Sequence, residues 1–346
     1  MAQRRNARRR RLWQPRSHPL ETALSLVILV LIAWVVWSTG AWLFTAADWS
    51  VVSENLPLFA VGSYPAEQRW RPMLWLLLLG AITVATLLQP VAHSPWKFSG
   101  QTLSLAWLAM LPIGWLLLSG GFGLPPVSSR DWGGLTLTLM LTGASGLLAV
   151  PLGILLALGR RSHLALPRVL SRLYIDGLRA VPLIAVLFFG QLLLPLFLPV
   201  EIEINRVLRA VIAFALFAAA YVAEDVRGGL QAIPHTQTEA AQALGLSPWQ
   251  TQRLVVLPQA LRIAVPALTN QAIGLLQNTS LMAILGLVEL LGISRSLMAN
   301  PEYIGRYLET YVWLGGLYWL ICSVMALLAR QLEVKTASPS TPAEHS

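Results

Sequence analysis

The 346-residue chain is predicted to be an all-α integral membrane protein with about eight transmembrane helices. Hydrophobic residues make up 55% of it and charged residues only 12%, and its mean hydropathy is +0.61. A soluble domain of this length could not bury so much apolar surface, so the bilayer must act as the solvent. The 14 tryptophans fit the same class, because Trp favours the membrane–water interface.

Eight apolar segments approach the roughly 20 residues that a spanning helix needs. The sixth is short and the seventh has a polar break. The segments are 23–44, 72–89, 102–120, 134–158, 180–199, 207–223, 270–291 and 312–329.

A basic stretch, residues 1–22, precedes the first segment, as in a signal peptide. The apolar run of the first segment is longer than the about 7–15 residues usual in a signal peptide, so an uncleaved anchor is favoured.

The distribution of Lys and Arg predicts the orientation of the chain. With the N-terminus in the cytoplasm and eight crossings, 18 of the 25 basic residues fall on the cytoplasmic side. Both termini and a polar loop, residues 228–262, are then cytoplasmic, whereas Glu201 and Glu203 lie outside. Arg69 and Arg71 flank the second segment on the outer side, against the trend.

A change in the length of the connections divides the chain near residue 132. Residues 23–132 are expected to form three accessory transmembrane helices with a long outer loop, 45–71. Residues 133–331 are expected to form five helices with shorter connections, and this second part contains the polar loop. The tail, 332–346, is polar and rich in Ser, Thr and Pro, and it is predicted to be disordered.

Several function classes are disfavoured by what the sequence lacks. Neither of the two lysines, Lys97 and Lys335, follows a glycine, so the chain has no P-loop and any ATP use would depend on a partner subunit. Cys322 is the single cysteine and the five histidines are scattered, so we expect no bound metal or other cofactor. The net charge of +9 reflects membrane topology better than nucleic-acid binding.

The polar loop carries the signals of a helix, a sharp turn and a second helix. A helix over about 236–244 would end at Gly245, which supplies the left-handed position that follows many helices. Ser247 and Gln250 then form a capping box, with proline at the first helical position. Pro258 is expected to disrupt the second helix. From these features alone, a capped amphipathic hairpin on the membrane surface is an alternative to a docking element.

The loop also resembles the signature of a protein family. Its spacing, Glu-Ala-Ala-x3-Gly-x9-Ile-x-Leu-Pro with valine in place of isoleucine, is typical of permease subunits of bacterial ABC importers. The resemblance implies that the loop docks into a cleft on an ATPase subunit and transmits the closure of this cleft to the membrane helices. The matching positions are Glu239, Ala240, Ala241, Gly245, Val255, Leu257 and Pro258.

Further stretches resemble the polar amino acid branch of that family, over about residues 130–330. The preceding part is similar to the larger permease of general L-amino acid importers, which has extra helices before a five-helix type I importer core. Asp176, Ala180 and Asn278 replace the usual Glu, Gly and Asp, which leaves the substrate range open. The similar stretches are 134–139, 157–162, 174–183, 220–229 and 278–281 in the core, and 64–71 and 120–134 before it.

The resemblance implies a transport subunit, not an enzyme, that moves L-amino acids across the inner membrane by alternating access. The implied partners are a second, related permease, two ABC ATPase subunits that use ATP and Mg, and a periplasmic amino-acid-binding protein. A stand-alone secondary transporter is the main alternative, although neither internal repeats nor many midplane charges are visible. An intramembrane enzyme would need a catalytic constellation that the sparse histidines do not provide.

Polar residues in the seventh segment are candidates for the substrate path. Asn278, Thr279 and Ser280 lie in an apolar run, where polar groups must find partners or line a cavity. Interhelical hydrogen bonding is the competing interpretation. Glu289, near the outer end of this segment, either senses substrate or faces water.

A few other side chains have competing interpretations. Glu224 and Asp225, near the cytoplasmic end of the sixth segment, are expected to be structural, with Arg227 or Arg179 as partners. Glu239 could contact the ATPase or be a surface carboxylate that is favoured near a helix N-terminus. Trp249 could anchor at the membrane interface or pack into the docking cleft.

Overall fold

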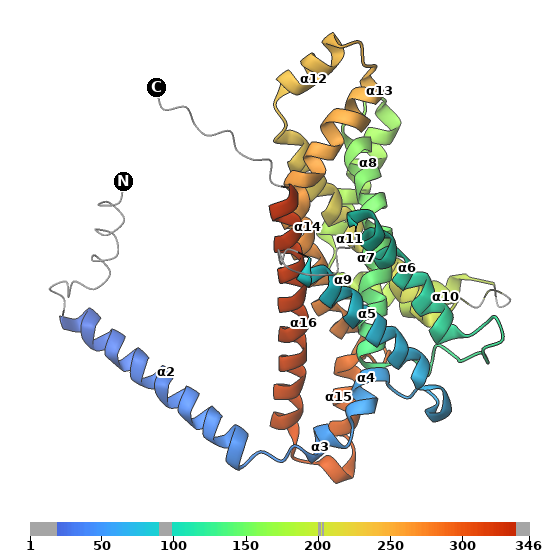
Figure 1. Ribbon diagram of the computed structural model, residues 1–346. Coiled ribbons are helices and arrows are strands. Elements are labelled where there is room, and N and C mark those ends of the chain that lie inside the picture. The colour runs from blue at the N-terminus through green and yellow to red at the C-terminus, as the bar shows by residue number, and fades with distance from the viewer. Residues whose placement is uncertain (1–18, 90–98, 200–201, 203, 337–346) are drawn as a thin grey trace. The chain divides into compact units, whose positions relative to one another are not determined.

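The computed structural model describes residues 19–89, 99–199, 202 and 204–336 of the chain (Figure 1). The chain divides into two compact units, Met1–Ser50 and Val51–Ser346. The predictions for the basic stretch before residue 19, for Lys97, for Glu201 and Glu203, and for the end of the tail lie outside the described residues.

The first unit contains one long helix, α2 (Pro19–Thr45). Its 27 residues would extend about 40 Å, enough to cross a bilayer. The helix is apolar on all sides and matches the first predicted segment, although it begins before residue 23. After its end, the indole N–H of Trp49 donates to the carbonyl of Leu43 at 3.1 Å, and the rings of Trp42 and Trp49 lie 6.3 Å apart.

The second unit is a bundle of long helices joined by short ones. Its long helices are α5 (Trp70–Leu88), α6 (Gly100–Ser119), α7 (Gly134–Arg160), α8 (Ala165–Ala180), α11 (Arg206–Gln231), α14 (Leu257–Asn278) and α16 (Tyr307–Thr336). The shorter elements are α3 (Ser50–Ser53), α4 (Leu56–Val61), η1 (Ala66–Gln68), α9 (Leu183–Phe188), η2 (Phe189–Leu193), α10 (Leu194–Phe197), α12 (His235–Ala243), α13 (Pro248–Gln250), η3 (Thr251–Val256), η4 (Thr279–Ala283), α15 (Leu290–Met298) and η5 (Pro301–Tyr303).

The predicted count of eight spanning helices is not confirmed. Among the described residues, six helices are long and apolar enough to cross a membrane, or seven if one bent pair counts as a single span. That pair, α8 with the segment 183–197, is bent by 104°. The bend lies at Val181, which is extended because the residue before a proline disfavours the helical region.

The predicted boundaries of the seventh segment, 270–291, are wrong. The helix α14 begins at Leu257 and ends at Asn278, and η4 and a second helix, α15, follow. The first half of α14 includes Gln259, Arg262 and Pro266, so hydropathy alone did not reveal that this half is helical.

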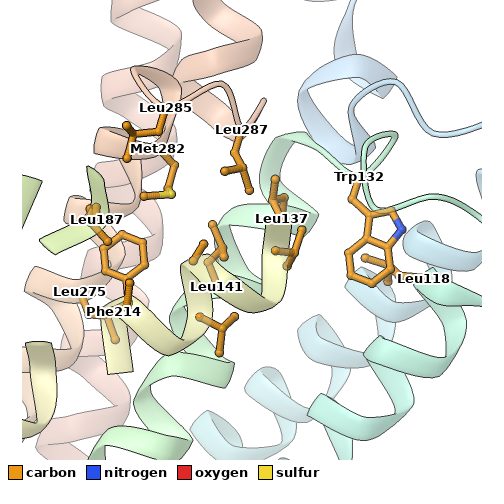
Figure 2. Packing of buried hydrophobic residues seen from close by; sticks show 14 of the residues in the cluster. Leu118, Trp132, Leu137, Leu141, Leu187, Phe214, Leu275, Met282, Leu285 and Leu287 are labelled. Atoms are coloured by element: carbon orange, nitrogen blue, oxygen red, sulfur yellow. The ribbon is translucent and has the colours of Figure 1, made fainter. Parts of the chain in front are cut away.

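The core of the second unit lies where α7 and α11 pack along each other, with α14 against α11. Figure 2 shows the apolar cluster at this contact, which includes Leu137 and Leu141 of α7 and Phe214 of α11. Small residues allow the close approach that membrane helices need. A Cβ on Gly153 would clash with Val222, and one on Gly229 would clash with the carbonyl of Ala260.

Within the second unit, segments that precede residue 132 pack into this same cluster. Val61, Tyr64 and Leu118 belong to it, together with Trp132. The segment predicted as the outer loop, 45–71, contains α3, α4 and η1 and the start of α5. At the other end of the chain, α16 continues to Thr336, so the first residues of the predicted disordered tail are helical.

Candidate coupling loop and polar residues of the core

The predicted helix–turn–helix projects from one end of the second unit (Figure 1). Its first helix is α12, His235–Ala243, which agrees with the predicted range of 236–244. The preceding Pro234 is extended and starts the helix. The side-chain amide of Gln259 donates to the side-chain oxygen of Gln237 at 3.3 Å and links the first turn of α12 to α14. The hairpin is therefore closed at its base.

The turn after α12 has the hydrogen bonds of a Schellman motif. The amide of Leu246 donates to the carbonyl of Ala241 at 3.2 Å, and the amide of Gly245 donates to the carbonyl of Gln242 at 2.9 Å. Gly245 has φ +82°, the left-handed conformation that the sequence predicted for it. Apart from Gly245 and its two chain neighbours, no atom of the described residues lies within 4 Å of where a Cβ on Gly245 would stand, so only its backbone conformation demands glycine.

The second helix begins with the predicted capping box. The Ser247 hydroxyl accepts from the amide of Gln250 at 3.3 Å, and the Gln250 side chain accepts from the amide of Ser247 at 2.9 Å. Two adjacent local motifs thus fix the turn without help from the rest of the protein.

The prediction that Pro258 disrupts the second helix is wrong. The segment Thr251–Val256 is a π-helix that runs directly into α14, and Pro258 lies in the first turn of α14. In an α-helix, a proline lacks the N–H for the carbonyl four residues earlier and clashes with it. The wider π turn contains one extra residue, so the carbonyl four residues before Pro258 neither needs an N–H from Pro258 nor clashes with its ring. The Thr251 hydroxyl and the side-chain Nε2 of Gln252 are buried in this turn, with no hydrogen-bond partner among the described residues.

The family signature divides into an exposed part and a buried part. Glu239 and Ala240 are exposed, whereas Ala241 is only 4% exposed and faces the packed side, where α12 meets η3. Two large apolar side chains also face solvent, Leu244 at 84% and Trp249 at 65% exposure. Such side chains on a polar projection mark a surface where another protein can bind.

A cluster of charges lies where α7, α8 and α11 meet, close to the loop. The carboxylate of Glu224 accepts from Arg160 at 2.8 Å and from Arg227 at 2.8 Å, and Arg179 lies 3.4 Å away. The predicted partners Arg227 and Arg179 are thus confirmed for Glu224. Sequence reasoning missed Arg160, although the pair Arg160-Arg161 at the end of a helix was a visible signal. Arg160 also contacts Asp176 at 3.2 Å.

The candidate pathway residues lie at the end of α14. Asn278 is the last residue of this helix, and Thr279 and Ser280 begin the 3₁₀ turn η4. Their hydroxyls donate to carbonyls three residues earlier, from Thr279 to Leu276 at 2.6 Å and from Ser280 to Gln277 at 2.8 Å. Thr279 also lies beside Tyr318 of α16.

Glu289 is fully buried, so the alternative in which it faces water is wrong. It caps α15, where its carboxylate accepts from the amides of Leu291 at 3.0 Å and Gly292 at 2.9 Å. The hydroxyl of Tyr318 donates to the same carboxylate at 3.2 Å. Tyr318 therefore brings Thr279 and Glu289 together, and the sequence reasoning had not identified it.

Comparisons with known proteins identify the family of the chain. Residues 149–337 match the family described as "Binding-protein-dependent transport system inner membrane component". The chain is 42% identical to the inner membrane amino-acid ABC transporter permease protein YhdY of Escherichia coli, over 86% of this chain and 80% of that protein. It is 33% identical to the glutamate/glutamine/aspartate/asparagine transport system permease protein BztC of Rhodobacter capsulatus, over 92% of this chain and 91% of that protein.

A solved structure supports the fold of the core. The chain resembles a subunit in the crystal structure of an amino acid ABC transporter with histidines, with 29% identity and a TM-score of 0.52, over 58% of this chain and 91% of that one. None of these matches supports the alternative of a stand-alone secondary transporter. The chain therefore belongs to the family of inner membrane components of binding-protein-dependent transport systems, the permease subunits of ABC importers.

Proposed function

We propose that this chain is a permease subunit of an ATP-driven importer that moves L-amino acids of several classes into the bacterial cytoplasm. The relative that shares the greatest part of this chain among those described above, BztC, is named for four amino acids, two acidic and two neutral. The orientation predicted from Lys and Arg places both termini and the projecting hairpin in the cytoplasm.

The observation that carries this proposal is the projecting hairpin, residues 235–256. It is closed at its base, its turn is fixed by a Schellman motif and a capping box, and its tip exposes Leu244 and Trp249. We assign to Glu239 and these two apolar side chains the contact with a partner ATPase, which hydrolyses ATP with Mg. Gly245 holds the shape of the turn, and Leu257 and Pro258 connect it to α14.

The hairpin is connected to the membrane helices on both sides. It follows α11 directly, and η3 continues into α14 without a break. Movement of the hairpin, when the ATPase closes, would therefore move α11 and α14 together. The charge cluster around Glu224 adds α7 and α8 to this moving group. Nucleotide shifts such an equilibrium only to the extent that it binds the two states differently.

The complete transporter in this proposal contains a second, related permease, two ABC ATPase subunits and a periplasmic amino-acid-binding protein. The substrate passes between the permeases by alternating access. Asn278, Thr279, Ser280 and Glu289 remain candidates for the substrate path. Tyr318 joins them because it contacts two of the four.

Radiolabelled uptake in a strain that lacks this gene tests the proposal. The panel contains acidic, neutral and basic L-amino acids and a sugar. We expect uptake of several amino acid classes to be lost, and to be restored by the wild-type gene and by Glu239→Gln but not by Glu239→Arg. Immunoblots of membranes control for insertion. Unchanged amino acid uptake in the deletion strain, or restored uptake without any ATPase subunit, would contradict the proposal.

A further inference from the structure

A small hairpin between α6 and α7, residues 120–124, presents one aromatic side chain to solvent. The amide of Gly121 donates to the carbonyl of Leu124 at 3.1 Å, and the amide of Leu124 donates to the carbonyl of Gly121 at 3.0 Å. The two residues at the tip, Phe122 and Gly123, both have positive φ, at +51° and +87°. Paired positive φ angles are the mark of a type I′ turn, in which Asn-Gly is the preferred sequence.

Phe122 is the only residue other than glycine with positive φ in the part of the chain that the structure describes. A bulky side chain is unfavourable in that conformation. The ring gains no packing in return, because Phe122 is 98% exposed. Backbone strain of this kind persists where the surrounding structure imposes it, and it is concentrated at sites of ligand or partner contact.

The residues around the hairpin hold Phe122 in this strained backbone conformation. Arg71, which is 1% exposed, donates from Nη1 to the carbonyl of Pro125 at 2.9 Å and lies beside Tyr64. The hydroxyl of Tyr64 donates to the carbonyl of Leu118 at 2.9 Å. A Cβ on Gly120 would clash with the carbonyl of Pro125, so the two sides of the base are in contact. Buried side chains therefore hold the base of the hairpin from one side, although Gly121 and Pro125 are themselves exposed, as is the tip.

The hairpin and the coupling loop are at opposite ends of α7. The hairpin precedes Gly134 at the start of α7, whereas Arg160 at its end contacts Glu224 of α11, close to the loop. The 27 residues of α7 separate these ends by about 40 Å. If the coupling loop is cytoplasmic, as in the proposed function, the hairpin is on the periplasmic side.

We propose that Phe122 is a docking contact for the periplasmic amino-acid-binding protein and inserts into an apolar depression on that protein. This inference rests on the proposed function, because it requires a binding-protein-dependent importer. An aromatic side chain has only two torsions, and here it stands on a turn that is held at its base, so little conformational entropy is lost when it binds a partner of defined shape. A bilayer adapts to any shape, so insertion into lipid would not require a strained turn.

Photo-crosslinking in intact cells tests this inference. The photoreactive analogue p-benzoylphenylalanine is placed at position 122, and separately at Trp249 on the coupling loop. We expect an adduct with a periplasmic amino-acid-binding protein from position 122 and an adduct with the ATPase from position 249. An adduct with phospholipid from position 122, or none, overturns the inference. An ATPase adduct from position 249 in the same experiment would leave the proposed function intact, and its absence would count against that function.

A titration with the captured binding protein, after purification, provides the second readout. Its concentration at half-maximal stimulation of ATPase activity is measured with the complete transporter in liposomes. Phe122→Asn relieves the strain, since Asn-Gly suits the turn, and removes the ring. We expect this variant to be at least as stable as the wild type, to keep its basal ATPase activity and to need at least tenfold more binding protein. Phe122→Tyr should behave as wild type. Equal half-maximal concentrations for wild type and Phe122→Asn would overturn the inference.

Discussion

The hydroxyl of Tyr318, in the last helix, donates a hydrogen bond to the buried carboxylate of Glu289, which caps α15. The carboxylate thus has three donors, two of them backbone amides of its own helix. This arrangement explains how an acid can be fully buried in an apolar core, because each hydrogen bond offsets part of its desolvation. It also fixes α15 against α16.

Removal of this hydroxyl should destabilise the protein measurably. Tyr318→Phe keeps the ring but takes one donor from a buried carboxylate, which typically costs about 1–3 kcal/mol. Thermal unfolding of the purified chain in detergent, followed by tryptophan fluorescence, measures the effect. Tyr311→Phe is the matched control, because Tyr311 lies on the same helix with a half-exposed side chain. Equal melting temperatures for the two variants would show that the hydrogen bond contributes nothing.

Substitution of Gly245 should separate backbone shape from side-chain size. A Cβ would meet no atom there, so a variant suffers only from its φ of +82°. Valine resists that conformation and should cost about 1–2 kcal/mol, whereas asparagine tolerates it. We expect Gly245→Asn to keep uptake and Gly245→Val to lose both uptake and co-purification with the ATPase. A Gly245→Val variant with normal uptake and co-purification would contradict the role of this loop in docking.

Neutralisation of Glu224 should cost more than neutralisation of Asp176. Glu224 contacts three arginines and its side chain is 15% exposed, whereas Asp176 contacts Arg160 with a side chain that is 60% exposed. We expect Glu224→Gln to lower the free energy of unfolding by about 2 kcal/mol, as for hydrogen bonds to charged groups. Asp176→Asn should change it by less than about 1 kcal/mol, as for an exposed ion pair. Denaturant unfolding in detergent compares them, and the reverse order would refute this account of the cluster.

The π turn before Pro258 should depend on that proline. Deletion of Arg253 removes the extra residue and forces an α-helical turn, in which Pro258 clashes with a carbonyl one turn earlier. We expect this deletion to destabilise the chain by about 3 kcal/mol. In combination with Pro258→Ala, the same deletion should cost much less.

Melting temperatures of the four proteins form a double-mutant cycle for this test. Additive effects of the deletion and the substitution would show that the π turn has a cause other than Pro258.

The features that the sequence predicted well are local in the chain. The left-handed turn at Gly245 and the capping box of Ser247 and Gln250 depend on residues within one or two turns of each other, and both are predictable from residue order alone. The contact of Glu224 with Arg227 could be predicted for the same reason, because residues three apart share a helix face.

The features that the sequence did not predict arise from packing between distant segments. Tyr318 is 29 residues from Glu289 in the chain, and Arg160 is 64 residues from Glu224. Arg71 was counted as an outer flanking charge, but it is buried and hydrogen-bonded to the chain 54 residues later. The course of η3 and α14 was also missed, because the usual effect of proline was applied without a neighbouring π turn.

The apolar cluster at the end of α7 has a consequence for the synthesis of the chain. Its members extend from Val61 to Leu287, so early and late segments complete one core. When α7 leaves the ribosome, the side chains that finally cover Leu141 have not yet been made. The helices that are inserted first therefore remain incompletely packed in the bilayer until α14 and the turn after it have been inserted. Assembly of this protein is accordingly a late event in translation, and a ribosome that stalls before residue 287 leaves the core open.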